Sequence, residues 1–144
     1  LDVSGLTVLA DLICTNNLLS NISFLDNDSL KTLNVGVNEL TSLDVSGNYD
    51  LTELSCVGNL LTSLDISQYA VLELLECYEN EFTSLDVSNN IALNQLSCWG
   101  NQLSSLDISN NPDLWRLYCN GNQLSSLDVS GKTAFQGSCK NERR

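Results

Sequence analysis

The chain has 144 residues, carries 18 acidic against 6 basic side chains, and contains no histidine. The formal charge of −12 argues against nucleic acid as a partner, because phosphate contacts need a basic surface, and the lack of histidine excludes His-based catalysis and His-ligated metals. No apolar run approaches the roughly 18 residues of a membrane-spanning helix, so we expect no membrane insertion.

A repeated tetrapeptide organises the whole chain. Leu-Asp-Val/Ile-Ser begins at Leu1, at Leu43 and then every 21 residues as far as Leu127, and a degenerate copy at Ile22 fills the first gap. A fixed period of this length is typical of a solenoid. We therefore predict a single domain over 1–144. Its expected units are 1–21, 22–42, 43–63, 64–84, 85–105 and 106–126, with a partial terminal unit at 127–144.

Each unit, numbered here from position 1 to 21, has the same apolar pattern. Residues 51–61 read L-x-x-L-x-C-x-x-N-x-L, and positions 12 and 14 alternate as a strand with one buried face requires. A short strand cannot bury its apolar side alone, so the units should stack about 4.8 Å apart into a parallel sheet. The remainder of each unit lacks a helical period, which predicts strand or extended backbone on both sides and little helix.

Two core positions form ladders along the array. Position 17 is asparagine in all six full units, and its amide can bond the backbone groups left unpaired where each strand ends. Position 14 is cysteine in five units and Val35 in the second. The cysteine ladder comprises Cys14, Cys56, Cys77, Cys98 and Cys119, and the asparagine ladder comprises Asn17, Asn38, Asn59, Asn80, Asn101 and Asn122.

The spacing of the cysteines bears on their chemistry. Side chains of one core position should run parallel about 4.8 Å apart, whereas a disulfide needs Cβ atoms near ~3.8 Å that face each other. We therefore predict buried free thiols, with disulfides as one alternative and a metal site as another, although ligands in a row do not converge tetrahedrally. Cys139 falls one place out of register, at position 13 of the last unit, so it should be exposed and able to bridge to a second chain.

The motif resembles the leucine-rich-repeat signature, and its short cysteine-bearing units are similar to the bacterial repeats of the internalin J type. The resemblance implies a right-handed leucine-rich-repeat solenoid, nominally α/β but here mostly β and irregular, with the parallel β-sheet on the concave face. It also implies protein recognition or adhesion by a secreted or cell-surface bacterial protein of which this chain is a module. We expect no cofactor and no enzymatic activity, because a flat open sheet offers no pocket that excludes water.

The strand face is where the sequence varies. Positions 11, 13 and 15 point outward from each strand, flanked by positions 10 and 16. Tyr78 and Trp99 share position 15 in adjacent units, whereas Tyr49 and Tyr69 are expected on the opposite side. Clustered exposed aromatics mark a binding surface, with simple packing along the sheet as the alternative. The predicted binding face comprises Leu74, Glu76, Tyr78, Glu79, Gln95, Trp99, Trp115, Arg116, Tyr118 and Asn120.

This face leaves the class of partner open. A protein ligand is the first expectation. A polysaccharide stacking on the aromatic side chains of units 64–84, 85–105 and 106–126 is the alternative, and a structural spacer in a surface protein is a third reading. The uncapped ends of the array also leave end-to-end self-association open.

Aspartate occupies position 2 of every unit except the second, between two core positions and hence pointing outward. Serine at position 4 and Ser or Thr at positions 20 and 21 are near enough to donate hydrogen bonds that offset the repulsion. The alternative is a row of weak calcium sites, because Ca²⁺ takes many oxygen ligands. Those sites would involve Asp44, Asp65, Asp86 and Asp107.

Overall fold

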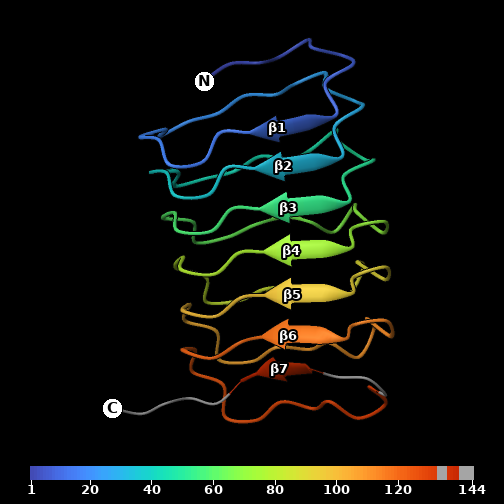
Figure 1. The fold of residues 1–144 in the computed structure, drawn as a ribbon. Coiled ribbons are helices and arrows are strands. Elements are labelled where there is room, and N and C mark those ends of the chain that lie inside the picture. The colour runs from blue at the N-terminus through green and yellow to red at the C-terminus, as the bar shows by residue number, and fades with distance from the viewer. Residues whose placement is uncertain (133–135, 140–144) are drawn as a thin grey trace.

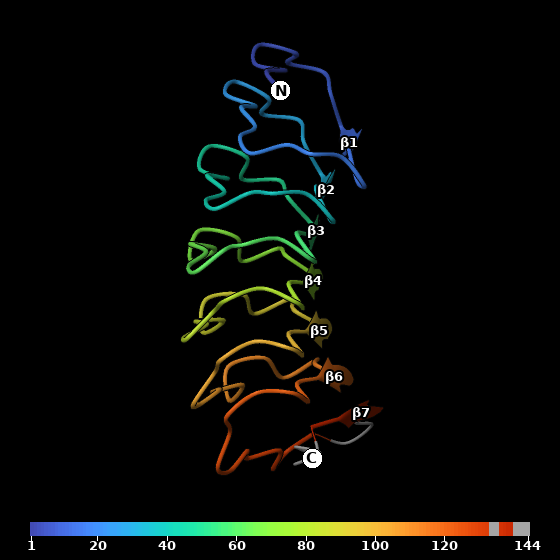
Figure 2. The ribbon, with the colours of Figure 1, turned by 90° about the vertical axis from the view of Figure 1, so that its left-hand side faces the viewer.

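The computed structural model describes residues 1–132 and 136–139 as a stack of coils with one short strand in each (Figure 1). The strands form one 7-stranded parallel sheet in chain order. Figure 2 shows the strands along the inner side of a shallow arc, which confirms the predicted parallel sheet on the concave face. No residue in these two ranges is helical. The strands are β1 (Asp11–Ile13), β2 (Thr32–Asn34), β3 (Glu53–Ser55), β4 (Leu74–Glu76), β5 (Gln95–Ser97), β6 (Arg116–Tyr118) and β7 (Gln136–Ser138).

A constant register fixes which side chains become neighbours. From β1 to β6 each residue pairs with the residue 21 positions later, as Leu12 does with Leu33 and Leu54 with Leu75. The ladder continues past the strand ends, since the amide of Cys14 donates to the carbonyl of Asn34 at 2.9 Å. Every repeat position therefore lies beside its own copy in the next coil.

The outer side of each coil carries no regular strand within the described residues, so the expected second strand is absent there. Stretches without turn or helix, such as residues 84–87, lead into two short turns at 88–89 and 91–92, and an isolated bridge joins Asp2 to Ser23. Neighbouring coils still exchange single backbone hydrogen bonds, such as the one from the amide of Glu39 to the carbonyl of Leu19 at 2.9 Å.

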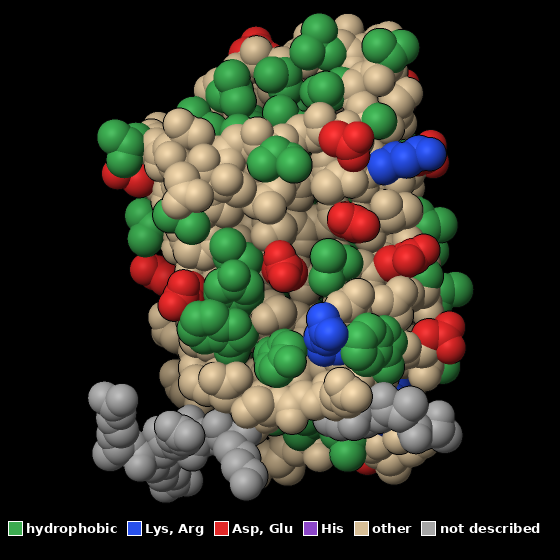
Figure 3. Space-filling view, viewed as in Figure 1, with side chains coloured by type: hydrophobic (Ala, Val, Ile, Leu, Met, Phe, Trp, Pro, Cys, Tyr) green, Lys and Arg blue, Asp and Glu red, His purple; other side chains and the backbone are tan. Residues whose placement is uncertain are grey.

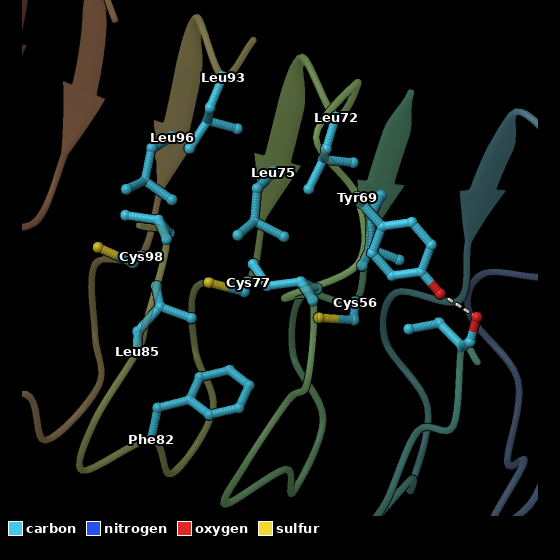
Figure 4. Close-up of a cluster of buried hydrophobic side chains, with 14 of the residues drawn as sticks. Cys56, Tyr69, Leu72, Leu75, Cys77, Phe82, Leu85, Leu93, Leu96 and Cys98 are labelled. Carbon is cyan, nitrogen blue, oxygen red and sulfur yellow. Dashed lines mark hydrogen bonds between the residues drawn. The ribbon is translucent and has the colours of Figure 1, made fainter. Parts of the chain in front are cut away.

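Leucine and cysteine side chains fill the interior between the strands and the turns. Figure 4 shows Cys56, Cys77 and Cys98 pointing into the core in one row, and all three are fully buried. Burial raises the pKa of the Cys56 and Cys98 thiols to about 12, because the charged thiolate would lose its hydration. These side chains, together with the partly exposed Cys14, are free thiols, as predicted for four members of the ladder.

Tyr69, which was grouped with Tyr49 on the side opposite the strand face, differs from Tyr49 in pointing into the core. Tyr49 is 63% exposed, but Tyr69 is completely buried and its hydroxyl donates to the carbonyl of Val45 (Figure 4). Tyr69 stands at position 6, where other coils carry a buried asparagine. Those asparagines also donate to carbonyls of the preceding coil, as Asn90 does to Ile66 at 2.9 Å, so the phenol replaces an amide donor.

The position-17 asparagines form the predicted ladder at the end of the strands. The Nδ2 of Asn101 donates to the carbonyls of Cys98 at 3.1 Å in its own coil and of Cys77 at 3.1 Å in the preceding coil. Its Oδ1 accepts the amide of Phe82 at 3.0 Å. One amide therefore closes its own turn and fastens it to the coil before. Equivalent bonds between coils are made by Asn38, Asn59, Asn80 and Asn122.

The last coil departs from the repeat and corrects two predictions about cysteine. Leu117 of β6 pairs with Gly137 of β7, an offset of 20 residues instead of 21. This shorter coil brings Cys139 level with Cys119, and the two form a disulfide with Cα atoms 4.6 Å apart. Cys119 is thus not a free thiol, and Cys139 is neither out of register nor available to a second chain. A Cβ at Gly137 would collide with the Leu117 carbonyl oxygen, so only glycine fits there.

The disulfide can be tested by counting thiols. Alkylation of the denatured, unreduced protein should label four cysteines, and reduction should raise the count to six, as mass spectrometry would show. Cys139→Ser should give five labels and lower the stability of the last coil by about 3 kcal/mol, since a loop of this length is no longer closed in the unfolded chain. Six labels before reduction, or a disulfide-linked dimer, would contradict the pairing.

The asparagine ladder can be tested by removing one amide. Asn101→Ala should lower the free energy of unfolding by about 3 kcal/mol, because the buried Phe82 amide loses its acceptor and the Cys77 carbonyl loses one of its two amide donors. Asn89→Ala, at an exposed asparagine nearby, is the matched control and should change it by less than about 0.5 kcal/mol. Urea denaturation followed by circular dichroism measures both, and equal effects would argue against the ladder.

Candidate functional site

A pair of stacked aromatic rings lies at the centre of the predicted binding face. Tyr78 and Trp99 follow β4 and β5 at the same repeat position, and the register places them in adjacent coils. Their ring centroids are 4.6 Å apart and their planes differ by 13°. This separation matches the spacing of neighbouring strands, so the sheet itself sets the stack.

Trp115 and Arg116 form a second contact one coil further along. The guanidinium carbon of Arg116 lies 4.5 Å from the centroid of the Trp115 ring. The same guanidinium donates through Nη1 to Oε1 of Gln95 at 3.0 Å. Two neighbours therefore hold the arginine across β5 and β6 in a cation–π contact.

A shallow hollow of about 70 Å³ opens between these two contacts. The hollow holds a few water molecules or the polar end of one side chain. In Figure 3, hydrophobic side chains gather over the lower strands on this face, with acidic side chains among and above them. The lining residues come from β4 to β6 and are Leu74, Glu76, Gln95, Leu96, Ser97, Arg116 and Tyr118.

Eight of the ten predicted residues therefore fall into three groups. Five of them line the hollow, two form the ring stack, and Trp115 supports Arg116 from the side. Asn120 continues the row of Tyr78 and Trp99 into the next coil, where its carbonyl accepts the amide of Gly100 at 2.9 Å, but it does not line the hollow. Leu96 and Ser97 also line the hollow but were not in the predicted binding face, although Ser97 stands at an outward strand position opposite Glu76 in the register.

Glu79 occupies an unusual backbone position at the edge of the stack. Its φ angle is 54°, in the left-handed region, and the same repeat position is glycine at Gly58, Gly100 and Gly121. A charged side chain here costs conformational energy that glycine would avoid. Glu79 is exposed, so its carboxylate stands in solvent beside Tyr78.

On the outer side, the position-2 aspartates accept hydrogen bonds from nearby serines. The Oδ1 of Asp86 accepts the amide of Ser88 at 2.9 Å, and that of Asp65 accepts both the amide and the hydroxyl of Ser67 at 3.0 and 2.7 Å. The serine hydroxyl, followed by the serine amide, lowers the pKa of both carboxyls. Across residues 1–132 and 136–139, no three Asp, Glu or Cys side chains converge as a metal site, so calcium gains no support from this arrangement.

The repeat, the parallel sheet and the internal ladders together define a leucine-rich-repeat solenoid of the cysteine-ladder kind. The chain belongs to the bacterial leucine-rich-repeat family. It is similar in structure to the functional domain of InlJ from Listeria monocytogenes, which includes a cysteine ladder. That similarity has a TM-score of 0.87 and 39% sequence identity, and it covers 94% of this chain but 31% of the InlJ chain.

A leucine-rich-repeat protein of Leptospira interrogans shares the fold alone, with a TM-score of 0.60 and 23% identity over 88% of this chain and 43% of that protein. The chain thus spans less than half of either solved structure. Comparison with family models and with curated proteins gives no match. The similarity to InlJ supports a protein-interaction or structural module in general terms. Within the described residues, no helix is long and apolar enough to cross a membrane.

The lowered carboxyl pKa values predict acid sensitivity. A carboxyl whose pKa is lower in the folded than in the unfolded state stabilises the fold at pH values above its unfolded-state pKa of 3.8. This stabilisation is lost as the pH falls through the folded-state pKa. The urea midpoint should therefore fall between about pH 5 and pH 2. Asp86→Asn combined with Asp107→Asn keeps the acceptor oxygens and should make that fall shallower. An unchanged pH profile would show that these carboxyls do not contribute.

Proposed function

We propose that this chain is a non-catalytic protein-recognition module that binds its partner through the strand face over β4 to β6. The observation that supports this most is the ring stack of Tyr78 and Trp99 beside the hollow next to Arg116. Tyr, Trp and Arg dominate the binding energy of protein interfaces, particularly when they cluster near the centre of a patch. The surrounding Glu and Gln side chains supply a polar rim.

The concave sheet also suits a protein partner in its shape. Seven parallel strands present one row of outward side chains per coil, and the shallow arc seen in Figure 2 can follow a convex surface. Solenoids use such extended inner surfaces for binding. In this proposal the module belongs to a secreted or cell-surface bacterial protein, and adhesion to another cell is the role that the family resemblance implies.

Carbohydrate binding is less well supported than protein recognition. A sugar ring stacks on an open aromatic face, but Tyr78 and Trp99 turn faces toward each other and Arg116 covers a face of Trp115. The hollow is also too small for a sugar ring to enter. A pure spacer would not require the aromatic cluster that breaks the regularity of the sheet.

The proposal predicts a specific loss on removing one ring. Peptides selected from a random phage-displayed library on the wild-type protein should bind Trp99→Ala at least tenfold more weakly, because a central aromatic contributes about 2 kcal/mol at such interfaces. Tyr49→Ala removes an exposed aromatic from the outer side and should leave the affinity unchanged. Isothermal titration calorimetry measures the affinities, and thermal melts confirm that both variants fold.

The site of binding is the decisive control. Hydrogen exchange with a bound selected peptide should show protection at β4 to β6. Protection confined to the outer turns would contradict the proposal. Saturable binding of one polysaccharide from a glycan panel, abolished by Trp99→Ala, would favour the carbohydrate reading in its place.

A further inference from the structure

The charge of the strand face indicates the chemistry of its partner. We propose that the partner presents a basic surface, with a lysine or arginine side chain that docks at the hollow beside Glu76 and the ring of Tyr78. This inference rests on the proposed function, because it concerns the same face, and it adds the sign of charge and the side chain that the face selects.

Carboxylates outnumber cations on the strand face. Glu53 and Glu76 lie in β3 and β4, and Glu73 and Glu79 flank β4 on either side. Glu73 and Glu79 are exposed, and Glu76 is half-buried at the hollow. These four lie in two adjacent coils on a chain whose formal charge is −12, so the face attracts cations at long range.

The described cations do not neutralise these carboxylates. Arg116 is held by Gln95 and by the ring of Trp115 on the β6 side of the hollow. Lys132 lies at the outer edge, where its ammonium donates to the carbonyls of Ile108 at 2.9 Å and Asn111 at 2.7 Å. Lys31 is exposed just before β2, where its carbonyl accepts the amide of Glu53 at 3.0 Å, so it lies beside Glu53 but two strands away from β4. Within residues 1–132 and 136–139, Glu76 and Glu79 therefore have no ion-pair partner, while Glu73 accepts a hydrogen bond from Asn94 at 3.4 Å.

The hollow has a lining that suits the end of a basic side chain. Leu74 supplies an apolar wall for the methylene groups, while the carboxylate of Glu76 and the hydroxyls of Ser97 and Tyr118 supply acceptors. Its volume of about 70 Å³ admits one such end and no larger group. Arg116 occupies the opposite side and donates to Gln95, which directs an incoming cation toward Glu76.

The ring stack adds a second attraction for a cation. Burial, followed by the charges of Glu76 and then Glu79, raises the pKa of the Tyr78 hydroxyl, and both carboxylates lie in the same coil as this ring. A cation near Tyr78 would therefore meet the negative potential of the ring together with two carboxylates. An acidic or purely apolar partner would instead leave these carboxylates unpaired or desolvated, which is unfavourable.

Two short peptides of opposite charge test the inference. Blocked hexalysine and blocked hexaglutamate are titrated into the whole chain while tryptophan fluorescence is recorded, since Trp99 and Trp115 both lie at the patch. Hexalysine should give a saturable change that weakens as salt is raised, and hexaglutamate should give none. The double variant Glu76→Gln, Glu79→Gln should weaken hexalysine binding between about threefold and tenfold.

A charge-matched variant separates a site from diffuse attraction. Asp86→Asn with Asp107→Asn removes the same charge from the outer side and should leave the hexalysine affinity within about twofold of wild type. An equal loss in both double variants would overturn the inference. A tryptophan response to hexaglutamate, or none to either peptide, would also overturn it.

The peptide-selection and hexalysine experiments can fail independently, so the proposed function and the basic partner are tested separately. If library-selected peptides protect β4 to β6 but are not enriched in lysine and arginine, the face binds protein and only the basic partner is wrong. If hexalysine binds at Glu76 and Glu79 while every selected peptide protects the outer turns, the cation site is present and the proposed function is wrong.

Discussion

The backbone of each coil depends on the coils on either side of it. A three-residue strand has no partner within its own repeat, so its amides and carbonyls are satisfied only by the next and the previous copies. This requirement fixes the register, and the register places each repeat position beside itself. The leucine core, the thiol row and the Asn101 type of bond all follow from that one pairing rule.

The same rule makes a binding surface from residues far apart in the sequence. Tyr78 and Trp99 are separated by a full repeat, yet their rings are in contact because both follow a strand at the same position. The core positions are nearly invariant along the array, whereas the outward positions are free to vary. Specificity in such a molecule is therefore carried by substitutions that leave the fold unchanged.

Much of the sheet and core could be predicted from the sequence, because a repeat of 21 residues implies that each strand residue pairs with the residue 21 positions later. The strand positions, the asparagine ladder, the four free thiols and the ring stack needed little more than the repeat. The failures came where a coil departs from the period. The burial of Tyr69 was not predicted, because position 6 had not been recognised as a buried donor, a role that Asn90 fills elsewhere.

The prediction for Cys139 was wrong because a constant 21-residue offset placed it one position away from the row of Cys119. The last coil is one residue shorter, and only the pairing of Leu117 with Gly137 reveals the change. The side chains around the hollow were outside the reach of sequence reasoning for a different reason. Their contacts, such as the bond of Arg116 to Gln95, depend on side-chain torsions that the repeat does not determine.

The bond between Cys119 and Cys139 also governs how the molecule carries a mechanical load. A pull on the chain beyond Cys139 passes through the sulfur atoms to Cys119 and bypasses the loop between them. The last coil therefore bears no tension while the bond is intact, although Gln136, Gly137 and Ser138 are all exposed and contribute little apolar packing. Force reaches the array at β6, within the regular stack, so an oxidised module resists peeling from this end and a reduced one does not.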